Sequence, residues 1–316
     1  MSQFIAALLI LILALIIDLI LGDPPDRLHP TVWMGRLITH LKCILKGGSP
    51  EVERIKGAIL CLVSIIVFTI PTCLLLIAVN SFLGAIAYVI LAAIALKPTF
   101  AIKGMAQYTV PIAKAIQQGR IDEARKMLPY IVRRSPINLT PAQIISAAVE
   151  SIAESTVDGI TSPIFFYAFF GVPGAIAFRV INTLDSMVGY KDAEHIWIGW
   201  FSAKVDTIAN YIPARITAIL MIPAAWILRK NWKNAWRILR RDRYKTESLN
   251  AGWPMAAMAG ALDLRLEKPG CYVLGDGHDP KPENIYDALK VMITTTFLFI
   301  ILITLPIIMT LFTFLG

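Results

Sequence analysis

Three carboxylates spaced four residues apart are the side chains best placed to do chemistry. Glu150, Glu154 and Asp158 lie in a stretch without Lys or Arg between Ser135 and Phe178. Residues four apart share one face of a helix, where like charges repel by roughly 0.2–0.5 kcal/mol per pair. Hard cations prefer oxygen ligands, so we expect this face to bind a magnesium ion carrying nucleotide phosphate, or the ammonium group of a substrate. The alternative is a solvated helix face that tolerates its own charge.

The surrounding residues predict a helix that begins at Thr140 and ends at Gly159. The Thr140 hydroxyl can accept a hydrogen bond from an unpaired amide at the helix start, and Pro141 is preset for the first helical position. An apolar stripe runs beside the carboxylates and predicts which face is buried. The stripe consists of Ile145, Val149 and Ile152.

A second group of polar residues follows this helix in an otherwise apolar region. Asp185 and Lys191 lie in the segment 182–191, and Asp206 and Asn210 share a helix face by their spacing. Each buried unpaired charge costs several kcal/mol, so repeated polar clusters in an apolar region indicate function. The oxygens of the Asp206–Asn210 pair are therefore expected in a metal site, either with Asp185 or with the carboxylate helix.

Other polar residues have less support from the sequence alone. His29 follows a proline-rich turn and is either a proton carrier or merely polar. The pair Arg133-Arg134 either clamps phosphate or flanks the helix in solvent. Arg215 lies inside an apolar stretch, where an arginine is a functional hypothesis by default.

The composition is that of an integral membrane protein. Of the 316 residues, 56% are hydrophobic and only 16% are charged, and the mean hydropathy is +0.64. The net charge of +8 comes from basic residues in loops that flank apolar runs, so it predicts topology rather than nucleic-acid binding. We expect one all-α membrane domain over residues 1–316, with a helical cytoplasmic insertion at 97–163 and a second cytoplasmic segment at 229–290.

Apolar runs predict a polytopic protein with about four full transmembrane helices. The two middle runs are separated only by Asn80-Ser81, so we expect them to form an antiparallel hairpin. Two further apolar stretches are interrupted by Gly or Pro and are predicted to be re-entrant or interfacial. The predicted full spans are 4–21, 57–79, 82–96 and 291–315, and the interrupted stretches are 164–177 and 208–228.

The positive-inside rule orients these spans. The loop 22–56 holds six Lys and Arg residues, whereas the 80–81 turn has none. This places the loop in the cytoplasm, the N-terminus outside, and the polar motifs on the cytoplasmic side of the cell membrane.

Two segments near the C-terminus have distinctive compositions. The basic stretch 229–243 is interleaved with Trp232 and Trp236, which favours an amphipathic helix on anionic lipid headgroups over nucleic-acid binding. The stretch 250–262 is rich in small residues and predicts close backbone packing or a flat apolar ligand.

The four cysteines form no CxxC pair and predict neither a zinc site nor a disulfide framework. A GxxxxGK[ST] motif is also absent, which excludes Walker-type nucleotide binding.

The motifs together resemble those of the CobD/CbiB family, the adenosylcobinamide-phosphate synthases of cobalamin biosynthesis, over nearly the whole chain. One departure is Ser155, where the family usually has Asn, and it puts one hydrogen bond in doubt. The matching motifs are Asp18-x-x-x-Gly22-Asp-Pro with His29-Pro30 and Gly35, Glu150-Ser-x-Ala-Glu154 with Asp158-Gly159, Asn182-Thr-Leu-Asp-Ser-Met-Val-Gly-Tyr-Lys191, Asn210-Tyr-x-Pro-Ala-Arg215, and Asn250-Ala-Gly-Trp-Pro-Met-Ala-Ala-Met-Ala-Gly-Ala-Leu262.

The resemblance implies an ATP-dependent ligase that requires Mg²⁺. Its implied reaction joins a carboxylate of adenosylcobyric acid to the amine of aminopropanol or aminopropanol phosphate, and it leaves the oligomeric state open. Elementary chemistry agrees, because a carboxylate forms an amide at neutral pH only after one oxygen has been made a leaving group, and ATP can do this by phosphorylation. Magnesium and basic side chains must then lie where phosphate charge moves, and water must be excluded.

We assign roles within the matched motifs accordingly. Asp185, through magnesium, and Arg215, directly, are expected at opposite ends of the reacting phosphate. The expected catalytic residues are Glu150, Glu154, Asp158, Asp185 and Lys191. The expected metal ligands are Glu150, Glu154, Asp158, Asp185 and Asp206. The expected substrate-binding residues are His29, Asn182, Asn210, Arg215, Asn250 and Trp253.

Two other function classes fit parts of the same pattern. A membrane prenyltransferase also uses spaced carboxylates to hold magnesium and diphosphate. A secondary transporter uses broken helices and intramembrane charges without chemistry. Prenyl transfer, or substrate flux without ATP turnover, would distinguish them from the ligase.

Overall fold

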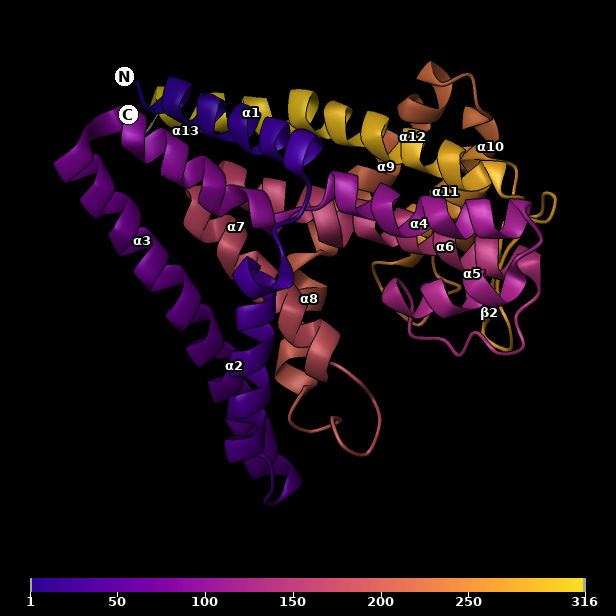
Figure 1. The fold of residues 1–316 in the computed structure, drawn as a ribbon, viewed down its shortest axis with the longest axis horizontal. Helices are drawn as coiled ribbons and strands as arrows, with labels where there is room; N and C mark the ends of the chain where they lie inside the picture. Colours follow the sequence, from indigo (N-terminus) through magenta and orange to yellow (C-terminus); the bar gives the residue numbers. More distant parts are fainter. Residues whose placement is uncertain (1, 315–316) are drawn as a thin grey trace. The chain divides into compact units, whose positions relative to one another are not determined.

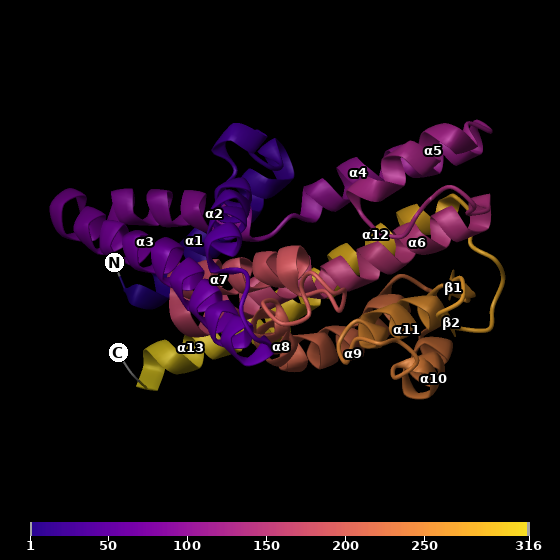
Figure 2. The same ribbon diagram turned by 90° about the horizontal axis from the view of Figure 1, so that it is seen from below.

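The computed structural model describes residues 2–314, most of which are helical (Figures 1 and 2). The predicted all-α class is confirmed, with one addition, a short antiparallel hairpin of two strands, β1 (Leu266–Lys268) and β2 (Tyr272–Leu274). The sequence predicted one domain over 1–316, whereas the described residues divide into two compact units. The second unit takes in the described residues of 102–161 and 211–302, and the first takes in the rest.

The first unit contains the N-terminal helices and the apolar centre of the chain. Within it, α3 packs against α1, α2, α7 and α8. Its helices are α1 (Gln3–Leu21), α2 (Pro30–Leu45), α3 (Pro50–Leu96), α7 (Ser162–Val188), α8 (Trp200–Ala209) and α13 (Leu305–Phe314).

The second unit contains the carboxylate helix and the basic and small-residue-rich segments. Helices α4, α6 and α12 run side by side, and the β1–β2 hairpin lies next to α11 (Figure 2). Its helices are α4 (Ile102–Gln117), α5 (Ile121–Met127), α6 (Pro141–Thr156), α9 (Tyr211–Ile227), α10 (Trp232–Asp242), α11 (Gly252–Ala261) and α12 (Glu283–Phe299).

Four helical stretches in residues 2–314 are long and apolar enough to cross a membrane, as expected for a polytopic protein. A further pair, α8 and α9, passes the same test only when the two helices are taken together across a break at Asn210. This break lies in the stretch 208–228, which the sequence predicted to be interrupted. Residue 315, at the end of the last predicted span, lies outside the described residues. The four stretches are Gln3–Leu21, Pro50–Gln117, Pro141–Val188 and Glu283–Thr313.

Two glycines with positive φ reverse the chain inside apolar helices. Gly84 (φ 82°) interrupts α3 close to the predicted 80–81 turn, and Figure 1 shows the chain turning back there. Gly171 (φ 64°) interrupts α7 where the sequence predicted a split. The rings of Phe166 and Phe178 stack with centroids 5.2 Å apart, although twelve residues of continuous helix would separate them by about 18 Å. Glycine is required at such reversals because it adopts positive φ without a steric penalty.

Helix α6 begins as predicted but does not end as predicted. Thr140 and Gln143 form a reciprocal capping box at its start, and the predicted apolar stripe is fully buried. Gly159 does not end the helix, because a π-helical segment, Val157–Thr161, continues directly into α7. Ile160 and Ile164 are fully buried beyond it, and their burial outweighs the helix penalty of about 1 kcal/mol for one glycine.

The small residues of α11 permit the close packing that the sequence predicted. A Cβ atom on Gly260 would lie 2.5 Å from the carbonyl oxygen of Asn234 and 2.7 Å from Cα of Ala235, both on α10. Gly260 therefore allows the backbones of α10 and α11 to touch, and the residue pattern of α11 is explained by packing.

Candidate functional site

Glu150 lies on α6 with 2% of its surface exposed, and both carboxylate oxygens are engaged. Oε1 accepts a hydrogen bond from Ser146 Oγ at 2.7 Å, and Oε2 accepts one from the Tyr272 hydroxyl at 2.8 Å. Arg134 forms an ion pair with the same Oε2. The charge of Glu150 is therefore neutralised within the protein, because the arginine just before the stretch without Lys or Arg folds back onto it.

The β1–β2 hairpin covers this part of α6. The backbone amide of Glu267 donates to Ser146 Oγ at 2.7 Å, and Arg134 donates to the Glu267 carbonyl at 3.3 Å. Burial and the neighbouring Glu150 raise the pKa of Tyr272, so its phenol stays protonated and donates to the carboxylate. The sequence analysis missed this hairpin, since strands of three residues around a Pro-Gly turn are too short to show an alternating pattern.

The other two carboxylates of the row are more accessible. Glu154 is exposed, and Asp158 is half-buried in the π-helical segment. The Oγ1 atoms of Thr161 and Thr217 lie 2.7 Å apart and join this segment to α9. π-helical turns often occur at functional sites. Glu154 and Asp158, at the end of α6 and in the π-helical segment after it, are therefore the carboxylates of the row that a ligand can best reach.

Arg215 begins a second cluster in the same unit, at the start of α9. Its guanidinium donates to the Tyr211 carbonyl at 2.8 Å, to Asn250 Oδ1 at 2.6 Å and to the Leu249 carbonyl at 3.1 Å. It also stacks on aromatic rings, 3.5 Å from the centroid of Tyr211 and 4.9 Å from that of Trp253. The structure thus brings together three residues predicted to bind substrate, namely Arg215, Asn250 and Trp253.

Helix α11 links this cluster to the Glu150 cluster. It packs against both α6 and α9. Trp253, near its start, faces Arg215, and Met255 Sδ lies 3.9 Å from the Tyr272 hydroxyl. Six of the predicted site residues therefore lie on α11 itself, in the turn before it, on α6 and the π-helical segment after it, or on α9. These are Glu150, Glu154, Asp158, Arg215, Asn250 and Trp253.

The remaining predicted residues belong to the first unit. Asn210 donates to Asp206 Oδ2 at 3.1 Å and accepts from Ser162 Oγ at 2.6 Å, which confirms that the Asp206–Asn210 pair shares a helix face. Asp185 is half-buried against Gly189, where a Cβ atom would lie 2.1 Å from Asp185 Oδ1. Lys191 is exposed.

No group of three or more His, Cys, Asp or Glu side chains within residues 2–314 is arranged to hold a metal ion. Any magnesium ion bound here would need further oxygens, such as those of a nucleotide phosphate, to complete its coordination. The predicted metal ligands stay predictions.

His29 is held in a defined tautomer. Its Nδ1 accepts the Thr31 amide at 3.2 Å as the N-cap of α2, so the proton of the neutral ring lies on Nε2, 4.0 Å from Asp23 Oδ1. Burial lowers the pKa of His29, against the opposing effect of Asp23. In this arrangement His29 can donate a proton from Nε2. It cannot accept one, because the lone pair on Nδ1 already accepts the Thr31 amide.

Two cations that the sequence analysis overlooked lie near His29. Lys97 is buried, 3.1 Å from the buried Asp18 Oδ1, and it also pairs with Asp23. Arg179 donates to the Thr99 carbonyl at 2.8 Å and to Asn182 Oδ1 at 3.0 Å, which orients the amide of this predicted substrate-binding residue. Charges inside or at the end of apolar runs are the signal that would have identified both.

A cavity of about 580 Å³ also lies in the first unit, and its lining is mostly apolar. Its polar lining includes Gln3, at the start of α1, Asn80 and Ser81, shortly before the break of α3 at Gly84, and Tyr167, whose hydroxyl already donates to the Ala7 carbonyl at 2.6 Å. None of the predicted site residues is among the described residues that line it. This cavity suits hydrocarbon rather than a polar reaction.

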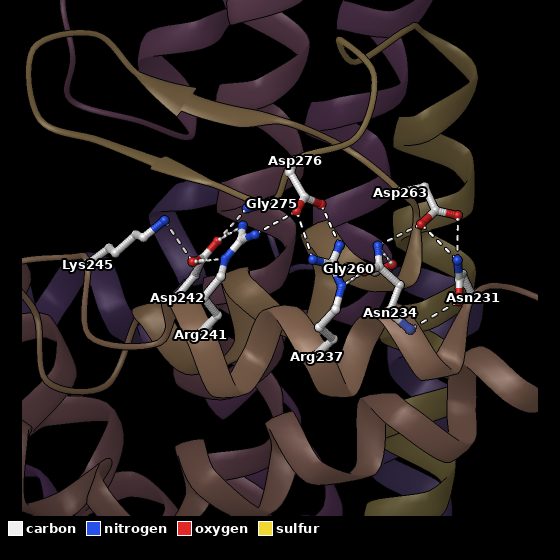
Figure 3. Close-up of polar contacts among 10 residues, drawn as sticks. All are labelled: Asn231, Asn234, Arg237, Arg241, Asp242, Lys245, Gly260, Asp263, Gly275 and Asp276. Atoms are coloured by element: carbon white, nitrogen blue, oxygen red, sulfur yellow. Dashed lines mark hydrogen bonds and ion pairs between the residues drawn. The ribbon is translucent and has the colours of Figure 1, made fainter.

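A network of charges fastens the end of β2 to α10 (Figure 3). Arg241 lies between two carboxylates, 2.7 Å from Asp242 Oδ1 and 2.6 Å from Asp276 Oδ2. Asp276 also binds Arg237 at 2.6 Å, and buried Asp242 accepts the Gly275 amide at 2.8 Å. The network fixes the chain just beyond Tyr272, the residue that reaches Glu150. Two arginines of this basic helix therefore serve the fold, whereas Trp232, Lys233, Trp236 and Arg240 remain exposed.

Similarity to known proteins extends over nearly the whole chain. The family model described as CobD/Cbib protein matches residues 11–296. The chain belongs to the CobD/CbiB family. CobD/CbiB relatives include the probable cobalamin biosynthesis protein CobD of Methanothermobacter thermautotrophicus, 43% identical over 92% of this chain and 94% of the relative. That of Thermoplasma volcanium is 40% identical over 98% of this chain and 100% of the relative. The cobalamin biosynthesis protein CobD of Dehalococcoides mccartyi is 40% identical over 86% and 88%. No solved structure matches the chain.

The Glu150–Arg134 pair generates the first prediction. Substituting Arg134→Gln leaves a buried carboxylate without its cation, which costs about 3–5 kcal/mol in comparable proteins. We expect a large drop in the midpoint of thermal unfolding of the purified protein. Adding Glu150→Gln should restore most of the loss, because a neutral amide needs no cation. A double variant as unstable as Arg134→Gln alone would contradict this account.

The network on α10 generates a prediction about pH. Burial alone would raise the pKa of Asp242, but hydrogen bonds from Arg241, Lys245 and the Gly275 amide hold it at about 2. Hydrogen bonds from Arg237 and Arg241 hold the pKa of Asp276 at about 2 as well. Both values lie below the ordinary pKa of about 3.9. The stabilisation is therefore complete above pH ~5 and is lost as the pH falls toward ~2.

The measurement compares wild type with the double variant Asp242→Asn/Asp276→Asn. The difference between their unfolding midpoints should be largest above pH ~5 and should shrink as the pH falls through the range from ~4 to ~2. Asp279→Asn is the matched control, since Asp279 lies nearby but its side chain is 72% exposed. A difference that stays constant down to pH ~2 would show that these carboxylates keep ordinary pKa values.

Proposed function

We propose that this chain acts in cobalamin biosynthesis as an ATP-dependent ligase that forms an amide between a carboxylate of adenosylcobyric acid and the amine of aminopropanol or its phosphate. Membership of a family whose curated relatives are named cobalamin biosynthesis proteins supports the pathway. The observation that carries the chemistry is the grouping around α11 of a carboxylate row with Arg215, Asn250 and Trp253. This set supplies oxygen ligands for a cation on α6 and donors for phosphate oxygens on α9.

The proposed reaction has two steps. The substrate carboxylate attacks the γ-phosphorus of ATP, which forms an acyl phosphate and releases ADP. The free amine then attacks the acyl carbon, the C–O bond to phosphate breaks, and the amide and inorganic phosphate leave. The amine loses one proton overall, so a proton acceptor must lie near it.

Glu154 and Asp158 fit a magnesium ion carried by nucleotide better than Glu150 does. They lie one helical turn apart and retain solvent access, whereas both oxygens of Glu150 are engaged by protein donors. Magnesium is commonly held by one or two carboxylates together with substrate phosphates and water. When bound, the ion would stabilise negative charge on the transferred phosphoryl group. Glu150 then holds the β1–β2 hairpin against α6 and is a positioning residue.

The chain's own side chains have distinct tasks in this proposal. Arg215 binds a phosphate oxygen through its fork, and Trp253 supplies an apolar wall that excludes water. Asn250 orients the guanidinium by accepting from it at 2.6 Å. Among the three carboxylates of the row, Glu154 makes the most direct contact with the ligand. The first-unit residues stay proposals for substrate or metal contacts, namely His29, Asn182, Asp185, Lys191, Asp206 and Asn210.

The proposal includes a multi-pass location in the cell membrane with the site on the cytoplasmic face. The apolar helices support the multi-pass character. ATP is available in the cytoplasm, and the basic loops near the polar motifs favour that side.

Product analysis tests the function. Purified protein incubated with adenosylcobyric acid, magnesium-ATP and each candidate amine should yield an amide product with the expected mass, together with ADP and phosphate. Glu154→Ala should abolish product formation without loss of folding, while Glu123→Ala, which removes an ion-paired glutamate from α5, should leave activity unchanged. Wild-type turnover by Glu154→Ala would remove its assigned role. Prenyl transfer or substrate flux without ATP turnover would replace the ligase by one of the alternatives.

Cysteine labelling tests the orientation. The four native cysteines are free in the structure, so replacing them by serine gives a background for single cysteines at Tyr190 and Asp279. A membrane-impermeant maleimide added to intact cells should miss both positions and should label them after permeabilisation. Labelling of either position in intact cells would contradict the proposed topology.

A further inference from the structure

Trp253 is flanked by two arginines, of which only Arg215 has a predicted role. The Cζ atoms of Arg215 and Arg243 lie 4.9 Å and 5.3 Å from the centroid of the indole ring. The ring of Tyr244 meets the indole edge-on, with centroids 6.2 Å apart and an interplanar angle of 89°. Arg243 also lies 4.5 Å from the Tyr244 ring. Two guanidinium groups and two aromatic rings therefore form one compact cluster.

Neither guanidinium in this cluster is neutralised by a carboxylate within residues 2–314. Arg215 donates to two backbone carbonyls and to the Asn250 amide oxygen, and Arg243 donates to the Arg240 carbonyl. The arginines of the nearby α10 network differ, since Arg237 and Arg241 both pair with Asp276. The cluster therefore carries two positive charges that no carboxylate in the described part of the chain neutralises.

Two buried donors in the cluster also lack an acceptor among the described residues. They are the indole Nε1 of Trp253 and Nε of Arg243. A buried donor left without a partner is unfavourable, and both groups can only donate. An anion that offers several acceptor oxygens would satisfy the donors and the charges together.

We propose that Arg243 and the Trp253 indole N–H join Arg215 to form a binding site for a phosphate group. Guanidinium forks match phosphate oxygens, and a phosphate presents enough oxygens to accept from several donors at once. This inference deepens the proposed function and rests on it only for the identity of the ligand. The phosphate belongs either to a soluble molecule, such as a nucleotide or a phosphorylated substrate, or to a lipid headgroup.

Arg243 also follows the last residue of α10 and binds the Arg240 carbonyl, as a C-terminal helix cap does. A cap role alone predicts a loss of stability on substitution and no change in phosphate binding. Arg243→Lys separates the two roles, because lysine keeps the positive charge that suits a helix C-terminus but loses the fork. Arg240→Lys is the matched control, since Arg240 is exposed and lies 5.9 Å from the Trp236 ring.

The experiment uses the full-length protein in phosphatidylcholine nanodiscs with inorganic phosphate as the probe, titrated at constant ionic strength. Tryptophan emission is recorded, and the contribution of Trp253 is isolated by subtracting the signal of Trp253→Phe. Wild type should show a saturable change that Trp253→Phe lacks. Arg243→Lys should weaken half-saturation about tenfold, whereas Arg240→Lys should match wild type.

Thermal unfolding of the same variants completes the test. An unchanged phosphate response in Arg243→Lys, with or without a lower unfolding midpoint, would overturn the proposal, as would the absence of any response in wild type. Nanodiscs containing phosphatidylglycerol distinguish the sources of the phosphate. Loss of the response in these discs identifies a lipid headgroup as the occupant, and its persistence identifies a soluble phosphate.

The outcomes separate this site from the proposed ligase activity. Amide product without a Trp253-dependent phosphate response would leave the function standing and remove the phosphate site. A phosphate response without any amide product would do the reverse. If both hold, Arg243→Lys should raise the KM for the phosphate-bearing reactant more than it lowers kcat, because Arg243 acts in binding.

Discussion

The cost of burying charge among apolar helices is the constraint on which the rest of this structure depends. Glu150 and Asp18 are both buried, and each is held by a cation from elsewhere in its unit, Arg134 and Lys97 respectively. A buried carboxylate that lost its cation would destabilise the protein by several kcal/mol. Each pair therefore ties a loop or helix end to an apolar helix. The position of such a polar segment is determined by the buried carboxylate that it must neutralise.

The Glu150 pair has a consequence for the arrangement of the candidate site. Arg134, Ser146 and Tyr272 all converge on or beside this carboxylate, so the β1–β2 hairpin is fastened to α6. Next to this fastened region, Glu154 keeps its solvent access. A rigid support beside an accessible carboxylate is the arrangement that a binding site for a charged ligand requires. The α10 network extends this support by fixing the chain after Tyr272.

The arginines of the second unit form two groups, which differ in whether a carboxylate neutralises them and not in their position along the sequence. Arg237 and Arg241 are neutralised by Asp276 and hold the fold together. Arg215 and Arg243 stack on Trp253 without a carboxylate partner among the described residues. Sequence spacing cannot separate these two groups, because the difference lies in which loops return to meet them.

The sequence by itself determined those features that depend on local chemistry and on hydrophobicity. These include the membrane-type helices, the Thr140 cap, the breaks near Gly84 and Gly171, and the shared face of Asp206 and Asn210. Tertiary structure decided the features that depend on distant partners. The capture of Glu150 by Arg134 and Tyr272, and the continuation of the helix through Gly159, follow from packing that local propensity does not encode. Local rules act over one or two helical turns, whereas a buried charge selects its partner from any segment that the fold brings within a few ångströms.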